Sequence, residues 1–304
     1  MSIRLSTVIL PHQRWHEGAR DEWVGAEQLG FHAAYTYDHL SWRSFRDRPW
    51  FGAVPTLAAA AAVTERIRLG TLVTSPNFRH PVPLAKDLLT LDDVSGGRVT
   101  LGIGSGGTSF DATALGQQPW SARERADRFE EFVTLLDHLL THPADASWEG
   151  RFYSAHEVRN LPGCVQRPRI PFAIAAIGPR AMRLAARHGR AWVTFGDPAL
   201  PEDATTEEWR ESLRRQVDRL VEAGAVEGRQ VEERILLLDS APPGTLQSVG
   251  AFVDLAGVVA ELGFTEVVLH WPIPDSVFAA DLATFEQIAT EAPAQLTRSS
   301  QTHS

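Results

Sequence analysis

A histidine flanked by an acidic residue and followed closely by a tryptophan is the part of this sequence best suited to chemistry. The run Tyr37-Asp38-His39-Leu40-Ser41-Trp42 directly follows an apolar segment. An imidazole gives or takes a proton near neutral pH, so His39 is the candidate general acid/base. In a structural alternative, Asp38 caps a loop and His39 packs beneath Trp42. Position at the end of a strand favours the functional interpretation.

Two glycine-containing turns could receive a planar or phosphorylated ligand. In the first, side chains disappear at Ser105 and Gly106, so a ring or phosphate could approach the backbone. The second offers the N–H groups of a helix N-terminus to an anion, and the hydroxyl of Thr194 could complete the cup. An ordinary strand-to-helix turn is the alternative. The residues of the second turn are Ala176, Ile177, Gly178, Pro179 and Arg180.

Composition excludes several classes of function. The net charge of −9 without a basic run argues against nucleic acid as a partner. No apolar stretch reaches the roughly 18 residues of a membrane span, and the N-terminus lacks a signal-peptide pattern, so we expect a cytoplasmic protein with no membrane contact. Metal-ligand spacing, a nucleophile elbow and a phosphate-binding lysine loop are all missing from the sequence, so no metal is expected.

Apolar runs alternate with amphipathic stretches along the chain, which is typical of βαβ units around a parallel sheet. We therefore predict an α/β fold, a single (β/α)8 TIM barrel over residues 1–292, with a disordered tail at 293–304. Residues 145–169 are too long for a simple loop and are interpreted as a hairpin insertion between strands 4 and 5. The expected strands are Arg4–Leu10, Ala33–Tyr37, Ile67–Thr74, Val99–Ile103, Phe172–Ala176, Ala191–Thr194, Ile235–Leu238 and Glu266–Leu269.

Taken in order, these segments resemble the luciferase-like family of flavin- and deazaflavin-dependent oxidoreductases. The most specific stretch is residues 66–107, which contains Arg66-Ile67-Arg68-Leu69-Gly70-Thr71, the step Arg79-His80-Pro81, and Leu91-Asp92-Asp93-Val94-Ser95-Gly96-Gly97-Arg98-Val99-Thr100-Leu101-Gly102. The similarity extends from Ile3 to about Thr290. An Asp-His pair after the second strand resembles the branch that uses coenzyme F420 rather than FMN.

The resemblance implies roles for individual residues. Asp38 would contact the deazaflavin head group, and His39 would exchange a proton with the substrate while hydride passes to or from the ring. A non-prolyl cis peptide at Leu72–Val73 would back the ring, and Ser105 and Gly106 would lie along it. The family's phosphate loop matches Ala176, Ile177, Gly178 and Pro179, and Arg180 is a plausible addition. A sugar phosphate is not expected as substrate, because Gly107 stands where that branch has a glutamate and Lys86 is the only lysine.

The opposite wall of the site is assigned to His12, Trp42 and Trp50, which favour a small apolar or aromatic substrate. Two alternatives stay open within the resemblance, an FMN-dependent two-component monooxygenase and a non-catalytic flavin-binding homologue. An unrelated barrel lyase or isomerase is disfavoured, because this sequence lacks the lysines and metal ligands that such an enzyme would need. The resemblance also implies a homodimer, because family members commonly dimerise through barrel helices and this fold offers broad apolar helix faces.

Overall fold

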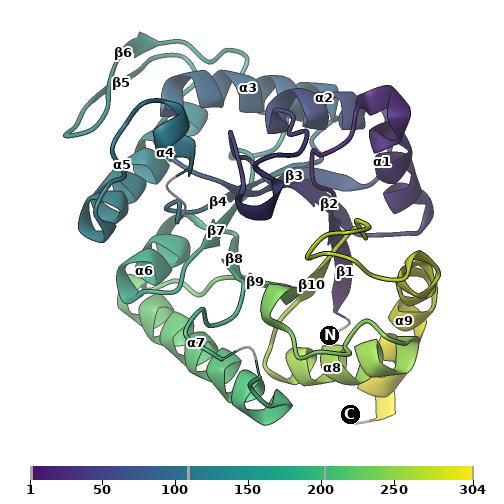
Figure 1. Cartoon of the computed structure of the whole chain (residues 1–304). Coiled ribbons are helices and arrows are strands. Elements are labelled where there is room, and N and C mark those ends of the chain that lie inside the picture. The colour runs from purple at the N-terminus through teal and green to yellow at the C-terminus, as the bar shows by residue number, and fades with distance from the viewer. Residues whose placement is uncertain (1–2, 108–109, 202, 303–304) are drawn as a thin grey trace.

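Eight parallel strands close into a barrel in the computed structural model, which describes residues 3–107, 110–201 and 203–302. Around the barrel the strands follow the order β1-β10-β9-β8-β7-β4-β3-β2, and helices surround them (Figure 1). This confirms the predicted fold, and each strand begins and ends within two residues of its predicted bounds. The barrel strands are β1 (Arg4–Val8), β2 (Ala33–Thr36), β3 (Arg68–Thr74), β4 (Val99–Ile103), β7 (Phe172–Ala175), β8 (Ala191–Thr194), β9 (Glu233–Leu237) and β10 (Glu266–His270).

Several helices begin where the sequence supplies a cap. The long helices α5 and α7 each open with a complete capping box, Ser121 with Glu124 and Thr205 with Glu208. Helix α3 starts at Pro81, whose fixed φ suits the first helical position. The helices are α1 (Ala19–Gln28), α2 (Ala53–Val63), α3 (Pro81–Val94), α4 (Phe110–Ala114), α5 (Ala122–Thr141), α6 (Pro179–His188), α7 (Thr206–Glu227), α8 (Val249–Glu261), α9 (Leu282–Thr302) and the short 3-10 turns η1 (Trp15–Glu17), η2 (Arg43–Phe45) and η3 (Leu238–Ser240).

The predicted insertion between the fourth and fifth barrel strands is a two-stranded antiparallel hairpin that projects beyond the ring of helices (Figure 1). Its strands are β5 (Ala146–Glu149) and β6 (Ser154–Val158). The carboxylate of Glu131 on α5 accepts hydrogen bonds from the backbone N–H groups of Arg151, Phe152 and Tyr153 at the turn. One side chain of α5 therefore fixes the tip of the insertion.

Apolar side chains form two layers, as strands covered on both faces require. One cluster lies between the strands and the surrounding helices and contains the fully buried Trp23, Trp192 and Trp209. The other fills the barrel interior and includes Val8, Val193 and the aromatic residues of the barrel mouth. The barrel is thus a packed core, and a ligand site must lie at one of its ends.

The C-terminal end departs from the prediction. The expected disordered tail from residue 293 is instead part of helix α9, which continues to Thr302 with Pro293 inside it. Both Ala292 and Leu296 are buried, so the helix still packs on the barrel beyond the proline. Burial of these two side chains supplies packing that the polar composition of the segment does not reveal.

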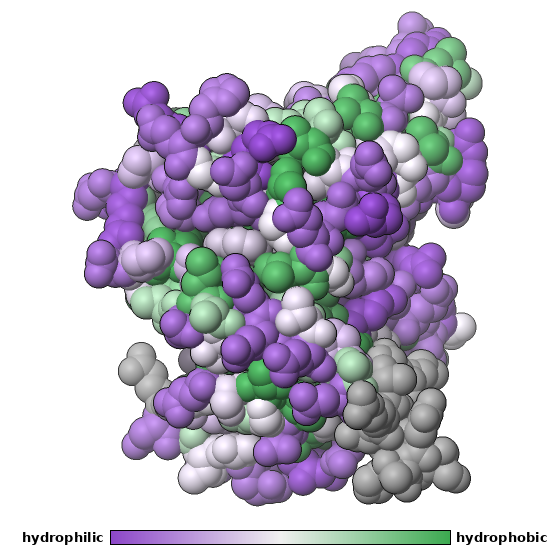
Figure 2. Space-filling model, turned by 90° about the vertical axis from the view of Figure 1, so that its right-hand side faces the viewer, coloured by the Kyte–Doolittle hydropathy of each residue, from purple (hydrophilic) through white to green (hydrophobic). Residues whose placement is uncertain are grey.

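The outer face of the molecule is mostly polar. On the side seen in Figure 2, apolar residues form small groups separated by hydrophilic ones. None of the helices built from the described residues combines the length and apolar character needed to cross a bilayer.

Candidate active site

His39 lies just past the end of β2, at the barrel mouth, where a buried carboxylate holds its ring. Its Nδ1 is 2.7 Å from Oδ2 of Asp111, and the Asp111 side chain has no solvent exposure. The other oxygen, Oδ1, accepts a hydrogen bond of 2.7 Å from the backbone N–H of Leu40. The indole N–H of Trp50 donates to the backbone oxygen of His39 at 2.7 Å. Ring and backbone of His39 are therefore both fixed.

Sequence reasoning missed Asp111. It stands on the short helix α4, which follows the glycine-rich turn after β4, and 72 positions separate it from His39. Its place after a barrel strand was the one available signal, because residues there face the mouth.

Asp38 makes contacts within the chain that the sequence did not predict. Its side chain is buried and forms a bidentate ion pair with Arg79, with Nε 3.0 Å from Oδ2 and Nη2 2.7 Å from Oδ1. The hydroxyl of Thr74, at the end of β3, donates to the same carboxylate. Both oxygens therefore bind the chain itself, and the expected contact with a cofactor head group stays a prediction. Asp38 ties β2 to the end of β3.

The predicted cis peptide at Leu72–Val73 is present, and β3 is irregular there. The register with β4 shifts between Thr71 and Thr74. Small residues on the adjacent strands make room for this bulge. A Cβ added at Gly104 would lie 2.9 Å from Cγ2 of Val73, so only glycine fits at this position without movement. The bulge and its small neighbours can support a flat ring.

The turn after β4 has the predicted permissive backbone. Gly106 has φ +74°, and a Cβ there would lie 2.3 Å from the side-chain nitrogen of Asn77. Glycine is therefore required for both conformation and space. Ser105 precedes it and is partly exposed.

The predicted phosphate loop leads into α6 as expected. Gly178 is the N-cap without a side-chain cap, and Pro179 occupies the first turn, so backbone N–H groups are available to an anion. Ala176 is buried, whereas Ile177 is exposed. The guanidinium of Arg180 binds Asp127 and Glu130 of α5, which the sequence did not predict. A phosphate contact from Arg180 would compete with those ion pairs.

Thr194 makes contacts within the chain that were not predicted. Its side chain is fully buried, and its hydroxyl donates to Oε1 of Gln216 at 2.6 Å. Oγ1 of Thr194 also accepts from the backbone N–H of Gly196 at 3.1 Å. Thr194 therefore shapes the turn after β8, and a phosphate would compete with Gln216 for its one O–H donor.

The residues assigned to the substrate wall converge on one aromatic cluster around Phe45. Ring centroids of His12, Trp42 and Trp50 each lie within 6.1 Å of the Phe45 ring. Trp42 also stacks on Phe278 from the loop after β10, at 5.7 Å. This cluster covers the mouth between the loops that follow β2 and β10.

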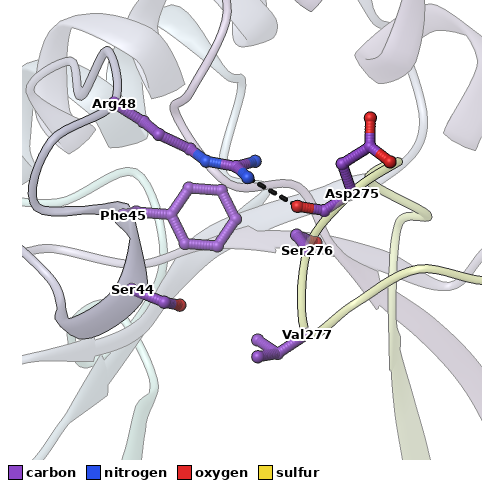
Figure 3. Close-up of a pocket in the computed structure, with 6 residues that line it drawn as sticks. All are labelled: Ser44, Phe45, Arg48, Asp275, Ser276 and Val277. Carbon is purple, nitrogen blue, oxygen red and sulfur yellow. Dashed lines mark hydrogen bonds between the residues drawn. The ribbon is translucent and has the colours of Figure 1, made fainter.

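A cavity of about 390 Å³ lies beside this cluster, between the same two loops. Figure 3 shows Ser44, Phe45 and Arg48 on one side and Asp275, Ser276 and Val277 on the other. A hydrogen bond of 2.5 Å from Arg48 Nη2 to the backbone oxygen of Asp275 joins the two loops. The cavity combines an apolar ring with hydroxyl and guanidinium groups.

A second polar cluster lies under Phe278 and was not predicted. The Tyr37 hydroxyl is 2.9 Å from Nε2 of His270, whose Nδ1 is 3.2 Å from Asp239. Burial lowers the pKa of His270 to about 3 and raises that of Asp239 to about 6. Burial also raises the pKa of Tyr37 well above its usual value. His270 is therefore neutral at pH 7.

Comparison with known proteins places this geometry in context. A family model described as luciferase-like monooxygenase matches residues 8–232. An F420-dependent glucose-6-phosphate dehydrogenase from Beutenbergia cavernae is 40% identical over 175 residues, which cover 56% of this chain and 50% of that protein. A 4-hydroxyprotoasukamycin monooxygenase from Streptomyces nodosus subsp. asukaensis is 31% identical over 225 residues, which cover 72% of this chain and 56% of that protein.

The likeness to solved structures concerns the fold. Monooxygenase RslO1 from Streptomyces bottropensis superposes with a TM-score of 0.76 at 22% identity, covering 98% of this chain and 100% of that one. The chain spans about half the length of the first two curated relatives it matches. With three quarters of its length matched by the family model, the chain belongs to the luciferase-like monooxygenase family.

Proposed function

We propose that this protein is an oxidoreductase that transfers a hydride between coenzyme F420 and a small organic substrate, with His39 as the proton donor or acceptor. The observation that carries the proposal is the buried Asp111 carboxylate on Nδ1 of His39. The pair resembles the orienting contact of a general acid/base, because the bond made by one ring nitrogen sets the state of the other. The relative from Beutenbergia cavernae, an F420-dependent dehydrogenase, supports the cofactor.

The residues at the mouth fit a flat ring with a phosphorylated side chain. The bulge at Leu72–Val73 and the small residue Gly104 offer a ring-sized floor, and Gly106 lets the backbone come close. Backbone N–H groups after Gly178 would receive a phosphate. When bound, the deazaflavin supplies the carbon that gives or takes the hydride.

The chain's own residues would orient the substrate and move the proton. Asp111 engages Nδ1 of His39, and Nε2 has no hydrogen bond to any residue of the described ranges, so Nε2 is the proton-exchanging atom. The aromatic cluster of Trp42, Trp50 and Phe278 would exclude water from the reacting atoms.

An apolar or aromatic substrate fits this wall better than a sugar phosphate. Lys86, the only lysine, donates its ammonium to the backbone oxygen of Arg159 beside the hairpin. No lysine is therefore left to bind a substrate phosphate at the mouth. We therefore do not propose for this chain the glucose-6-phosphate dehydrogenase activity for which the relatives are named.

An FMN-dependent two-component monooxygenase is the second candidate, and similarity to the Streptomyces nodosus monooxygenase favours it. A non-catalytic flavin-binding protein is the third. The His39–Asp111 pair argues against a non-catalytic protein, since burying a carboxylate without a function is costly.

We also propose a homodimer, which light scattering would test. A single-chain mass at micromolar concentration would contradict it.

The first experiment is a fluorescence titration of the purified protein with F420 and FMN in parallel. Tight binding of F420 with much weaker binding of FMN supports the proposal, and the reverse preference supports the monooxygenase. Candidate alcohols, aldehydes and aromatic compounds are then screened by the absorbance change of F420.

The role of His39 has its own test once a substrate is found. His39→Ala should leave the Kd of F420 nearly unchanged and lower kcat by roughly 10²–10⁴-fold. His156→Ala, on the exposed hairpin, is the matched control and should change neither. Unchanged turnover in His39→Ala would remove His39 from the mechanism.

A further inference from the structure

The end of the barrel opposite His39 contains a second pocket, built at the N-terminal ends of the strands. Its volume is about 210 Å³. Arginines line it from three directions: Arg4 opens β1, Arg68 opens β3, and Arg190 immediately precedes β8. Parallel strands bring these starting residues to one end of the barrel. Three guanidinium groups therefore face one small cavity.

Carboxylates balance only part of this charge. Glu233 binds both Arg4 and Arg190, the latter with Nε 2.7 Å from Oε1. Glu266 lies 3.4 Å from Arg4, and its burial raises its pKa. Three positive charges thus face two negative ones inside the pocket. Outside it, Glu232 lies 3.8 Å from Arg190 on the solvent side and is 60% exposed, so water screens its charge.

Arg68 is the residue with unbalanced charge. No carboxylate oxygen of the described residues lies within 4 Å of its guanidinium, which instead donates to neutral oxygens of Thr100, Val99 and Gln166. A half-buried cation with only neutral acceptors is unusual, because desolvation of a charge is costly without a counter-charge.

Hydrogen-bond donors in the pocket also outnumber their acceptors. Within the described ranges, Nε of Arg4 is buried without a hydrogen-bond partner. The hydroxyl of Thr100 accepts from Arg68 and donates to no described residue. Nη1 of Arg68 and both Nη atoms of Arg190 also make no hydrogen bond to any described residue. These donors belong to groups that bind oxyanions well.

We propose that this pocket binds a small tetrahedral oxyanion of the phosphate or sulfate class, held by Arg68, Arg4 and Arg190. Such an anion offers several acceptor oxygens, which match convergent guanidinium and hydroxyl donors, and it supplies the missing negative charge. A single carboxylate has fewer acceptors and one charge. The site is independent of the proposed hydride transfer, because it lies at the other end of the barrel.

His32 provides a local reporter for the anion. It lines the same pocket, and burial together with the nearby charges of Arg4 and Arg68 lowers its pKa to about 4. The groups that face it are Arg4, Arg68 and Glu233. At the pH where His32 titrates, bound sulfate would be a dianion and bound phosphate a monoanion. Either would offset part or all of the two arginine charges and shift the titration of His32 to higher pH, sulfate more strongly.

The test compares inorganic phosphate and sulfate with chloride at equal ionic strength, using calorimetry and proton NMR of the full-length protein. The His32 resonance is assigned with His32→Gln. We expect saturable binding of phosphate or sulfate and an upward shift of the His32 titration. Arg68→Gln should weaken the affinity roughly tenfold or more, since it removes a charge-assisted contact. Arg66→Gln, which removes an exposed charge two positions away, should leave it unchanged.

The His32 signal separates this pocket from the predicted phosphate loop at Gly178, which lies at the other end of the barrel. Absence of a phosphate-dependent shift of His32 in the wild-type protein overturns the proposal. Equal phosphate affinity in the wild type and a folded Arg68→Gln variant overturns it as well. If Arg68→Gln does not fold, the wild-type titration of His32 decides the question alone.

Discussion

The contact between His39 and Asp111 can be measured directly, without a substrate, by a double-mutant cycle. The four proteins are wild type, His39→Ala, Asp111→Ala and the double variant. Asp111→Ala also removes the hydrogen bond to the backbone N–H of Leu40. That loss occurs on both sides of the cycle and cancels, so the coupling free energy reports the pair alone.

The structure sets the expected size of this coupling. The two groups are 2.7 Å apart, Asp111 is fully buried, and the His39 side chain is only 12% exposed. Solvent therefore screens the contact little. A hydrogen bond to a charged group contributes about 1.5–3 kcal/mol, which is the coupling we expect.

Urea unfolding followed by tryptophan fluorescence gives the four free energies, and the nine tryptophans provide the signal. The exposed pair Asp127–Arg151, 3.3 Å apart, serves as the control cycle and should give roughly 1 kcal/mol or less. A coupling of about 0.5 kcal/mol or less for His39 and Asp111 would refute the orienting role. In that case Asp111 serves only to fix the loop at Leu40.

Three further predictions follow from the same structure. Asp38→Asn breaks a buried ion pair and should lower the free energy of unfolding, measured in urea, by about 3–5 kcal/mol. Asp21→Asn, at an exposed position, is the control and should change this free energy by about 0.5 kcal/mol or less. Equal effects of the two substitutions would be inconsistent with a buried pair. Asp239→Asn should stabilise the protein more at pH 7 than at pH 4. Burial raises the pKa of Asp239 to about 6, so the folded chain keeps a proton that the unfolded chain loses. The stability of the wild type therefore falls as the pH rises from the unfolded pKa of Asp239 to its folded pKa. The full shift corresponds to about 3 kcal/mol, and partial exposure of the side chain reduces the expected gain to about 1–2 kcal/mol; a gain independent of pH would count against the assignment. Gly104→Ala places a Cβ 2.9 Å from Cγ2 of Val73 and should raise the Kd of F420 roughly tenfold by titration, while an unchanged Kd would show that this surface does not face the cofactor.

The fold could be predicted well because its signal is local. Apolar runs of strand length alternate with helical patterns, and each barrel strand was located within two residues. Helix starts can carry a local signal too. Helix α3 begins at Pro81, since His80 caps it and proline suits the first turn.

The site could be predicted only in part. The position of His39 followed from its place after a predicted strand, and the cis peptide at Leu72–Val73 followed from the family resemblance. Side-chain partners did not follow, because they depend on contacts across long sequence distances. Asp38 binds Arg79, and Arg180 binds helix α5. The family resemblance had suggested a ligand contact for Asp38, and the turn before α6 had suggested one for Arg180. A charged side chain near a site binds whichever partner the fold brings within reach, and a single sequence does not contain that information.

The imidazole of His39 depends on two separate loops at once. His39 and Trp50, which holds the His39 backbone, belong to the loop after β2, and Asp111 reaches the ring from the segment after β4. Loops at a barrel mouth open locally at lower free energy than the core strands. We therefore expect the contact between His39 and Asp111 to open before the barrel unfolds, so partial denaturation should abolish the proposed proton transfer while the barrel is still folded. Loss of activity on mild heating or in low urea would report opening at the mouth and would say little about the stability of the barrel itself.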